Sequence, residues 1–479
     1  MTSGNLHEPA RETPVLGTWD VVVCGGGAAG CAAALGAARH GARVLLVEKD
    51  GYLGGATVSQ LVAHILSTNA VDFQGVWHTW IRAIRRRRAD AVAPLVHQGA
   101  QWRSGVDPEV VKFAWDDLFA EAGVDQLLHA CVAGAAVEDG RCTAVLVETK
   151  AGRRALRTAR AIDCTGDGIL AAAAGVPWDH GQQNGEPWNQ ALTKVFRMGN
   201  VAWPAGGLTE EAVTAAREAI RAAVERGEFT SPVVANGRAI RYGTANYVHH
   251  SVVPYRTEMN VFPSRVLQVD PLDPFDLTRA EREGRDQAWQ SAEALRRYAP
   301  GFEAAYLLDT NAHIGLRDSR RIRGIATATA DDVWNLVQRA DGIARSSWNI
   351  DIWPGDSYDN AAVPHGEATY EAWKTRIQAG EYFGIPYGAI VAREIDGFLV
   401  AGRCLSAERE AQASLRIQQT CMATGEAAGV AAALSLREGV PPRELDPALV
   451  VRQLAADRDV EPAFDNLRDI PVAPRKEPV

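Results

Sequence analysis

Three glycines near the start of the chain, Gly25, Gly27 and Gly30, have the spacing of a loop that binds phosphate through its backbone. Glycine has no Cβ, so a ligand can come close to the chain and the chain can turn sharply. Glu48 ends the second of two apolar runs that flank the loop, where a carboxylate accepts hydrogen bonds from ribose hydroxyls. These residue types at this spacing predict a dinucleotide site, which can serve a nicotinamide or a flavin.

The elements around these residues are those that such a site needs. Residues 21–23 are predicted as a strand, the small residues 28–40 as a helix and residues 42–47 as a second strand. The helix would begin at Ala28 and Ala29, whose amides lie at its positive end and favour a phosphate. An ordinary tight turn explains the glycines alone, but not the ordered strand, turn, helix, strand and acid, so we favour the dinucleotide site.

The composition is that of a large globular enzyme. The 479 residues are 47% apolar and carry a net charge of −9, which argues against a broad nucleic-acid surface. No apolar run reaches the ~20 residues that cross a bilayer, and the first residues lack the pattern of a secretory signal. Seven cysteines without a Cys-x-x-Cys pair are typical of reduced thiols. We expect a cytoplasmic protein with no resident metal, no membrane segment and no nucleic-acid partner.

The character of the sequence changes twice along the chain. Alanine- and glycine-rich segments with β-rich runs occupy the first part, and the same style returns near residue 397. Between them, tryptophans, prolines and charged helical segments dominate, which predicts an α/β protein whose outer domain is interrupted by another. We assign residues 19–176 and 384–440 to the outer domain, 177–383 to the insertion and 441–479 to a C-terminal extension, and expect residues 1–18 to form a loose arm.

Three further segments carry a resemblance to a known family. They are GYLGGATVS at 51–59, AIDCTGDG at 161–168 and LVAGRCLSA at 399–407, and a helix beginning near Gln419 follows them. In this order, after the glycine loop, they resemble the FAD-dependent oxidoreductase family of the glutathione-reductase-like flavoprotein superfamily. The resemblance implies a Rossmann-like FAD-binding domain with a doubly wound sheet, an inserted α/β substrate domain, and FAD as the cofactor. It is poor across residues 181–300.

The resemblance also implies which residues bind FAD. The ADP half would contact the glycine loop, the helix start and the acid with its neighbour, which are Gly25, Gly27, Ala28, Ala29, Gly30, Glu48 and Lys49. The second glycine loop, Gly54, Gly55, Ala56 and Thr57, would lie on the flavin side, and Val132 would pass the adenine. Thr165, Gly166 and Asp167 would close over the diphosphate, and Gly402 and Arg403 would contact the ribityl–phosphate region, with Arg416 retained from the same late motif.

The helix that begins near Gln419 would point its positive end at the flavin edge that becomes negative on reduction. The chain departs from the family pattern at two places nearby. Relatives often have Arg where this chain has Gly388, and many have Pro where it has Gln419. Because both changes fall where flavin and substrate would meet, FAD binding carries over from the resemblance and the substrate does not.

The sequence offers no second glycine fingerprint for a nicotinamide domain of its own. We therefore expect electrons to enter from the organic substrate, as a hydride from a C–H that bears oxygen or nitrogen. Such a carbon also has a proton to lose from its O–H or N–H, and histidine is the usual base near neutral pH.

Candidate catalytic residues come from the predicted inserted domain. His313 or His250 is predicted to take the proton and Arg317 to hold a polar group of a small-molecule substrate, with Tyr387 as the next candidate base. His249, His365 and Arg256 are further candidates of the same types. A structural role stays open for each histidine, and Arg317, Arg320 and Arg321 can instead form an ion-pair cluster.

The leading prediction is an FAD-dependent dehydrogenase or oxidase of a small polar metabolite. A flavin-dependent monooxygenase or halogenase shares the early glycine motif, but the chain has no Trp-x-Trp-x-Ile-Pro element of the halogenase kind. A non-catalytic flavin scaffold for electron transfer is the third possibility. The tryptophan-rich insertion favours a ligand pocket and therefore an enzyme.

Overall fold

A computed structural model gives the fold. It describes residue 6 and residues 10–68, 70–93, 96–98, 101–181, 185–202, 208–240, 258–358 and 366–460. Within these residues no helix is long and apolar enough to cross a membrane.

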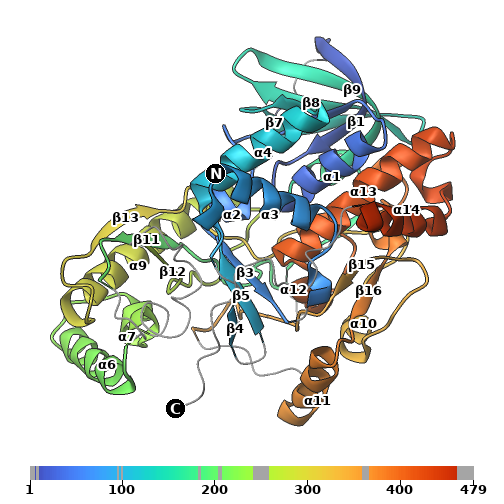
Figure 1. The fold of residues 1–479 in the computed structure, drawn as a ribbon. Helices are drawn as coiled ribbons and strands as arrows, with labels where there is room; N and C mark the ends of the chain where they lie inside the picture. Colours follow the sequence, from blue (N-terminus) through green and yellow to red (C-terminus); the bar gives the residue numbers. More distant parts are fainter. Residues whose placement is uncertain are drawn as a thin grey trace.

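A largely parallel sheet forms the centre of the fold, at the upper right of Figure 1. Its strands run parallel in the order β6 (Asp125–Leu127), β2 (Val44–Val47), β1 (Val15–Cys24) and β9 (Gly152–Asp163), with β17 (Phe398–Val400) paired to the end of β9. Val21 to Cys24 and the whole of β2 are buried, as continuous apolar strands in a parallel sheet must be. The late segment near residue 400 therefore shares a sheet with the glycine-loop strand.

Helices cover one face of this sheet. They are α1 (Ala28–Arg39), α3 (Val76–Arg87), α4 (Pro108–Ala122) and α13 (Gln418–Arg437), whose buried residues share one core with Val21 and Val23. α1 and α13 lie unusually close together, because a Cβ on Gly425 would overlap with the carbonyl of Ala29 and one on Gly429 with the carbonyl of Ala33. The small residues of both helices thus allow their backbones to come this close.

The opposite face of the sheet has a different cover. β7 (Cys131–Glu138) and β8 (Arg141–Thr149) form an antiparallel arm on β9, and α5 (Ile169–Ala173) follows β9. Buried side chains of this arm share a core with Val22 and Cys24 of β1 and with Leu45 and Val47 of β2. The α/β fold with a Rossmann-like parallel sheet is therefore confirmed, and one of its two covering layers is a β-arm.

The insertion has a small antiparallel sheet and a core of its own. Its strands are β11 (Phe196–Gly199), β12 (Met259–Val261) and β13 (Tyr306–Thr310), and α6 (Glu210–Glu225), α7 (Pro232–Ala235) and α9 (Pro274–Tyr298) pack on them. Figure 1 shows this group at the lower left, away from the parallel sheet.

A second group within residues 177–383 packs elsewhere. β15 (Gly342–Ser346) pairs with β16 (Phe383–Pro386), and with α10 (Ala330–Asn335) and α11 (Glu367–Gln378) they contribute to the core that contains α13. The domain limits at residues 177 and 384 stay a prediction.

The remaining elements are short or terminal. They are α2 (Ala56–Ser59), β3 (His64–Ser67), η1 (Ala70–Asp72), η2 (Ala89–Ala91), β4 (Val96–Gln98), β5 (Gln101–Gly105), β10 (Trp178–Asp179), β14 (Arg321–Ile322), η4 (Tyr387–Ala389), η5 (Gly402–Cys404), α12 (Arg409–Leu415), η6 (Pro442–Glu444) and α14 (Pro447–Val460).

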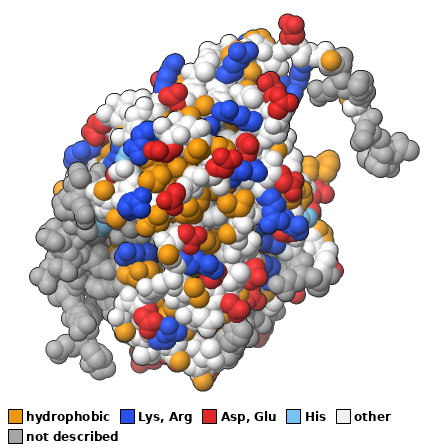
Figure 2. All heavy atoms as spheres, turned by 90° about the vertical axis from the view of Figure 1, so that its right-hand side faces the viewer, with side chains coloured by type: hydrophobic (Ala, Val, Ile, Leu, Met, Phe, Trp, Pro, Cys, Tyr) orange, Lys and Arg blue, Asp and Glu red, His pale blue; other side chains and the backbone are white. Residues whose placement is uncertain are grey.

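One expectation about the amino end is wrong. Residues 15–18 are not part of a loose arm, because β1 begins at Val15 and pairs with β9 from Ala155 onward. On the face of the molecule in Figure 2, basic and acidic side chains alternate around a patch of hydrophobic ones, without a broad field of one sign.

Candidate active site

The glycine loop lies between β1 and α1, as its spacing predicts. Gly25 has a φ of 100°, and a Cβ there would lie 2.5 Å from the carbonyl oxygen of Cys164. A Cβ on Gly30 would overlap with the carbonyl of Gly25. At Gly27, in contrast, the nearest atom to a Cβ is the Cα of Gly55 at 3.8 Å, so this glycine faces open space. Gly25 and Gly30 are required by the fold, and Gly27 leaves room for a ligand.

Glu48 ends β2 beside this loop. One carboxylate oxygen accepts a hydrogen bond from the amide of Gly26 at 2.6 Å, and the other accepts one from the amide of Asp50 at 2.9 Å. A carboxylate has about four lone-pair positions, so each oxygen of Glu48 can still accept a ribose hydroxyl. The acid therefore holds the loop in place and keeps acceptors for a nucleotide.

The second glycine loop faces the first. Gly55 has a φ of 47° and its backbone lies directly against Gly27, while Gly54 has a φ of 116°. From Ala56, the chain starts α2, and the hydroxyl of Thr57 donates to the side chain of Gln418 at the beginning of α13. The two loops and the start of α13 thus meet at one place.

The remaining motif segments lie at the same edge of the sheet. Arg403 forms an ion pair with Asp167 at 2.7 Å, and a Cβ on Gly166 would lie 2.9 Å from its guanidinium. A Cβ on Gly402 would lie 2.7 Å from the Cβ of Ala29 in the first turn of α1. Thr165 donates its hydroxyl to the buried Asp163 at 2.7 Å.

Val132 lies on β7 opposite Val147, two residues after Ala130, whose amide donates to the carbonyl of Glu48 at 3.0 Å. The structure therefore brings together the residues predicted to bind the two phosphates and the ribose, and the strand of Val132 begins beside the ribose acid.

The residues present fit FAD. The backbones of Gly27 and Gly55 lie against each other at the amino end of α1, where helix amides and the helix dipole favour phosphate. Glu48 supplies ribose acceptors, and α13 begins next to Thr57 and Arg416. Together they can hold the ADP part at α1 and direct the positive end of α13 to the flavin part.

The start of α13 also borders a small cavity. Thr57, His64, Trp77, Gln418 and Gln419 are among its lining residues. The amide groups of the two glutamines are fixed, because Gln418 donates to the carbonyl of Val62 at 2.8 Å and Gln419 to that of Leu66 at 3.0 Å. The His64 ring lies edge-on to Phe262 at 4.9 Å.

His64 was not among the predicted bases. The sequence signal that could have found it is its position on a short strand directly after the second glycine loop.

His313 lies at a different part of the site. Its Nε2 is 2.9 Å from a carboxylate oxygen of Asp50 and 3.0 Å from Nζ of Lys49, and its side chain is 45% exposed. Asp50 and Lys49 follow Glu48 directly, so His313 lies near the residues predicted to bind ribose. The Asp50 pKa is lowered: its burial acts to raise it, and His313 and Lys49 more than offset that burial. His250, His249, His365 and Arg256 lie outside the described residues.

Tyr387 points away from the cofactor loops. Its hydroxyl donates to the carbonyl of Pro442 at 2.7 Å, the side chain is buried, and burial raises its pKa. A phenol in this state is a poor base.

Arg317 belongs to a cluster of arginines around Trp353. The guanidinium of Arg317 lies 4.4 Å from the centre of a Trp353 ring, and those of Arg265 and Arg238 lie at 4.6 and 5.4 Å. Asp351 lies two residues before Trp353 in the chain. Arg416 donates to its backbone carbonyl at 2.7 Å and to its carboxylate at 3.2 Å. The pKa of Arg317 is lowered to about 9, mainly because the side chain is buried and next because the positive charge of Arg416 lies nearby. Arg320 instead bonds the carbonyl of Asp167 at 3.0 Å.

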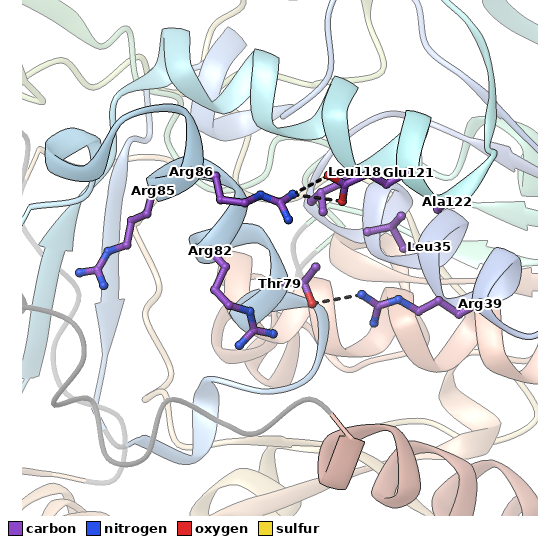
Figure 3. Close-up of a pocket in the computed structure, with 9 residues that line it drawn as sticks. All are labelled: Leu35, Arg39, Thr79, Arg82, Arg85, Arg86, Leu118, Glu121 and Ala122. Atoms are coloured by element: carbon purple, nitrogen blue, oxygen red, sulfur yellow. Dashed lines mark hydrogen bonds and ion pairs between the residues drawn. The ribbon is translucent and has the colours of Figure 1, made fainter.

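A separate basic pocket of about 760 Å³ lies between α1, α3 and α4 (Figure 3). Arg39, Arg82, Arg85 and Arg86 line it, and Arg86 pairs with Glu121 at 2.9 Å. None of the cofactor-motif residues lines this pocket. The run of arginines at the end of α3 thus pairs in part with acids of α4, as a solvated helix face does.

Comparison with known proteins gives one short sequence match and many structural ones. A vinyl phenol reductase of Lactiplantibacillus plantarum is 60% identical over 40 residues, which is 8% of this chain and 8% of that protein. A geranylgeranyl bacteriochlorophyll reductase-like protein of Thermoplasma acidophilum is 12% identical, with a TM-score of 0.44 over 92% of this chain and 84% of that one. An L-amino acid deaminase of Proteus vulgaris is also 12% identical, with a TM-score of 0.40 over 92% and 94%. At these values the likenesses carry no argument about the reaction.

The model of one protein family matches almost the whole chain. It is that of the FAD dependent oxidoreductases, and the match runs from residue 20 to residue 456. This range contains the glycine loop, Glu48, the Thr165 segment and the start of α13, and it agrees with the resemblance read from the motifs. The chain belongs to the FAD dependent oxidoreductase family, and its cofactor is FAD.

Proposed function

We propose that this enzyme oxidises a small polar metabolite at a carbon that bears oxygen or nitrogen. One observation carries the proposal: the short segment from Arg416 to Gln419 contacts the Thr57 loop on one side and Asp351 of the arginine cluster on the other. A metabolite at this segment would lie between the FAD loops and fixed positive charges. Bound FAD supplies the two-electron acceptor for a hydride.

The residues of the chain have separate tasks in this proposal. Loss of a hydride from H–C–O–H or H–C–N–H leaves one proton to remove, so the oxidation needs a base within hydrogen-bond reach. We propose His64 for this role because it lines a cavity of about 10 Å³, room for one water molecule, at the start of α13. His313, which pairs with Asp50, is the second candidate, and Arg317 holds a polar group of the metabolite.

The sequence supports the metabolite as the source of electrons. The chain has one glycine fingerprint of the dinucleotide type, and we assign the FAD of this family to it. A nicotinamide domain would need a second one. A monooxygenase would have its flavin reduced by NAD(P)H. An electron-transfer scaffold would have its flavin reduced neither by NAD(P)H nor by an organic metabolite.

The test is anaerobic reduction of the purified yellow protein. We expect the flavin absorbance to bleach with at least one of a panel of alcohols, hydroxy acids, amines and amino acids, and to persist with NADH and NADPH alone. Bleaching by NADPH alone would favour the monooxygenase alternative. No bleaching by any organic compound would contradict the proposal.

A further inference from the structure

The chain that leads from the end of α2 to β3 is held by parts of the fold that are distant in sequence. Irregular backbone that is shielded from water has to find hydrogen-bond partners elsewhere. Along the five residues 59–63, each carbonyl accepts from such a donor, in order the amide of His313 at 3.1 Å, the side-chain amides of Asn311 at 3.3 Å, Asn260 at 3.1 Å and Gln418 at 2.8 Å, and the amide of Val106 at 2.9 Å.

Leu61 lies in the middle of this segment with an unfavourable backbone conformation. Its φ is 53°, in the left-handed region that residues with a Cβ rarely adopt. Such a conformation persists only where the surrounding structure fixes it, and it often occurs at functional sites. Asn260 donates to the carbonyl of Leu61 itself, and Asn311 and Gln418 donate to the carbonyls on either side. The three side-chain amides therefore hold the strained residue in place.

His64 follows this segment as the first residue of β3. Gln418 donates to the carbonyl of Val62, two residues before His64, at 2.8 Å. Gln419 donates to the carbonyl of Leu66, two residues after His64, at 3.0 Å. Both glutamines belong to the first turn of α13, so the start of this helix is bonded to the chain on both sides of His64.

The insertion contacts the same histidine. Asn260 lies on β12, and Phe262 directly follows the last residue of that strand. Side chains two residues apart along a strand lie on one face. Asn260 donates to the carbonyl of Leu61, three residues before His64, and the ring of Phe262 meets the His64 ring edge-on at 4.9 Å. The end of β12 therefore contacts both the strained residue and the histidine ring.

Packing is incomplete beside His64. The cavity of about 10 Å³ at the start of α13 is lined by His64 together with Gln418 and Gln419. A side chain that borders a cavity has fewer van der Waals contacts to hold it. The hydrogen bonds to the neighbouring carbonyls therefore contribute more to the position of His64 than they would in a close-packed core.

We propose that Asn260, Phe262, Gln418 and Gln419 are positioning residues that fix His64 at the start of α13, and we call them the His64 clamp. This inference rests on the proposed function, in which His64 takes the proton of the metabolite. A base has to stay within hydrogen-bond reach of that proton, and a displacement of about 1 Å can cost roughly a hundredfold in rate. Because the clamp joins the insertion to α13, both have to be in place before His64 is.

Hydrogen exchange of the oxidised, FAD-loaded enzyme tests the clamp without turnover. Asn260→Leu and Gln419→Leu each remove one donor, from two different elements, and leave a carbonyl without that partner. We expect amide exchange in residues 60–66, measured by mass spectrometry, to become roughly tenfold faster in each variant, the effect of about one lost hydrogen bond. Exchange in the glycine loop, residues 25–30, should stay at the parental rate.

The ring resonance of His64 in the NMR spectrum gives a readout that a loss of stability alone would not move. It is identified by its absence from His64→Ala. We expect it to shift in Asn260→Leu and in Gln419→Leu, because the ring changes its position relative to the aromatic ring of Phe262. Anaerobic flavin reduction by a metabolite that reduces the parent should slow roughly tenfold to hundredfold in both variants, with unchanged FAD content.

Gln287→Leu is the matched control. The Gln287 side chain is buried like that of Gln419 and also donates to a backbone carbonyl, that of Arg265 at 3.1 Å, but it lies on α9. This variant should show parental exchange in residues 60–66 and an unmoved His64 signal. Thermal unfolding and FAD content would establish that every variant is folded.

The outcomes separate this inference from the proposed function. Parental exchange and an unmoved His64 signal in both clamp variants would overturn the clamp, even if His64→Ala slows flavin reduction. The same changes in Gln287→Leu would mark them as a general loss of stability and also overturn it. Parental reduction rates in both clamp variants, with a slow His64→Ala, would overturn the positioning role. A shifted signal and faster exchange, with parental reduction in His64→Ala, would support the clamp and count against His64 as the base.

Discussion

At the scale of single residues, Glu48 shows how one side chain can shape the protein and the site together. Its two oxygens accept the amides of Gly26 and Asp50, so the same carboxylate ties the glycine loop to the end of β2. The position and residue type of Glu48 could be predicted because strand, turn and acid have a fixed spacing in this architecture. The hydrogen bonds from Gly26 and Asp50 could not be predicted, because they depend on the backbone conformation of the glycine loop and of the residues after β2.

Replacing Glu48 by Gln should weaken FAD retention. The variant keeps the shape but loses the charge, and hydrogen bonds to a charged acceptor contribute about 1.5–3 kcal/mol, so we expect roughly tenfold to hundredfold weaker binding. FAD per protein and the affinity of the apoprotein for added FAD measure the effect. Glu121→Gln, at an exposed carboxylate paired with Arg86, is the control. Unchanged retention would remove the ribose role from Glu48.

Two histidine variants should separate the candidate bases. Removing a general base costs about 10²–10⁴ in rate, so His64→Ala should slow anaerobic flavin reduction by that factor while FAD stays bound. His313→Ala should change it little, because His313 pairs with Asp50 beside the ribose acid. Stopped-flow absorbance measures both rates, and higher pH should partly restore the His64 variant. If His313→Ala slows flavin reduction more than His64→Ala does, His313 is the better candidate for the base.

At the scale of elements, we expect the close contact between α1 and α13 to decide where the cofactor can lie. α13 begins at Gln418, one residue before the start that the sequence predicts. The small residues of α1 and α13 were visible in the sequence, but their mutual contact joins residues far apart in the chain. For the same reason, the sharing of Asp351 between Arg416 and Trp353 could not be predicted.

Gly425→Ala should disturb this contact strongly. The added Cβ would overlap with the carbonyl of Ala29, which is backbone and cannot move aside as a side chain can. Overpacking of this kind costs about 1–3 kcal/mol, and the displacement of α1 should also lower FAD content. Thermal unfolding and FAD content measure these effects.

Gly140→Ala gives the comparison for that variant. Gly140 has a φ of 75° in the turn between β7 and β8, and nothing lies within 4 Å of the position of its Cβ. This variant should show only the cost of the backbone conformation, about 1 kcal/mol, and keep its FAD. Equal loss of FAD in both variants would mean that the α1–α13 contact does not position the cofactor.

Asp72 should give the fold a pH dependence of known sign. It accepts bonds from the hydroxyl of Ser67 at 2.6 Å and the amide of Ser347 at 2.7 Å, and burial raises its pKa from 3.8 to about 6 despite them. Because the folded pKa is the higher one, the folded chain binds more protons between about pH 4 and pH 6. Stability due to this group therefore falls as pH rises through that range, by about 3 kcal/mol in all, and is constant above it.

Thermal unfolding of the parent and of Asp72→Asn across this range measures the dependence. The difference between the two melting temperatures should change between pH 4 and pH 6, with the parent losing stability relative to the variant as pH rises. Parallel curves would show that Asp72 has an ordinary pKa.

At the scale of the whole molecule, we propose that different parts of the chain bind the cofactor and the substrate. The elements around the glycine loop could be predicted from the sequence, because their glycines and acid keep a spacing that a dinucleotide imposes. The arginine cluster around Trp353 could not be predicted, because its arginines come from separate segments and have no common spacing. His64 was missed for a related reason: its position relative to Gln418 depends on the contact between the second glycine loop and α13.

The most direct test of the account is a single anaerobic turnover with a panel of alcohols, hydroxy acids, amines and amino acids. The account predicts that at least one of them gives one molecule of carbonyl product, or of the imine that hydrolyses to it, for each FAD reduced, and that reduction is slower when the C–H is replaced by C–²H. It also predicts no requirement for NAD(P)H or oxygen. Full occupancy by FAD with no reduction by any such compound, and bleaching only when NADPH is added, would contradict it.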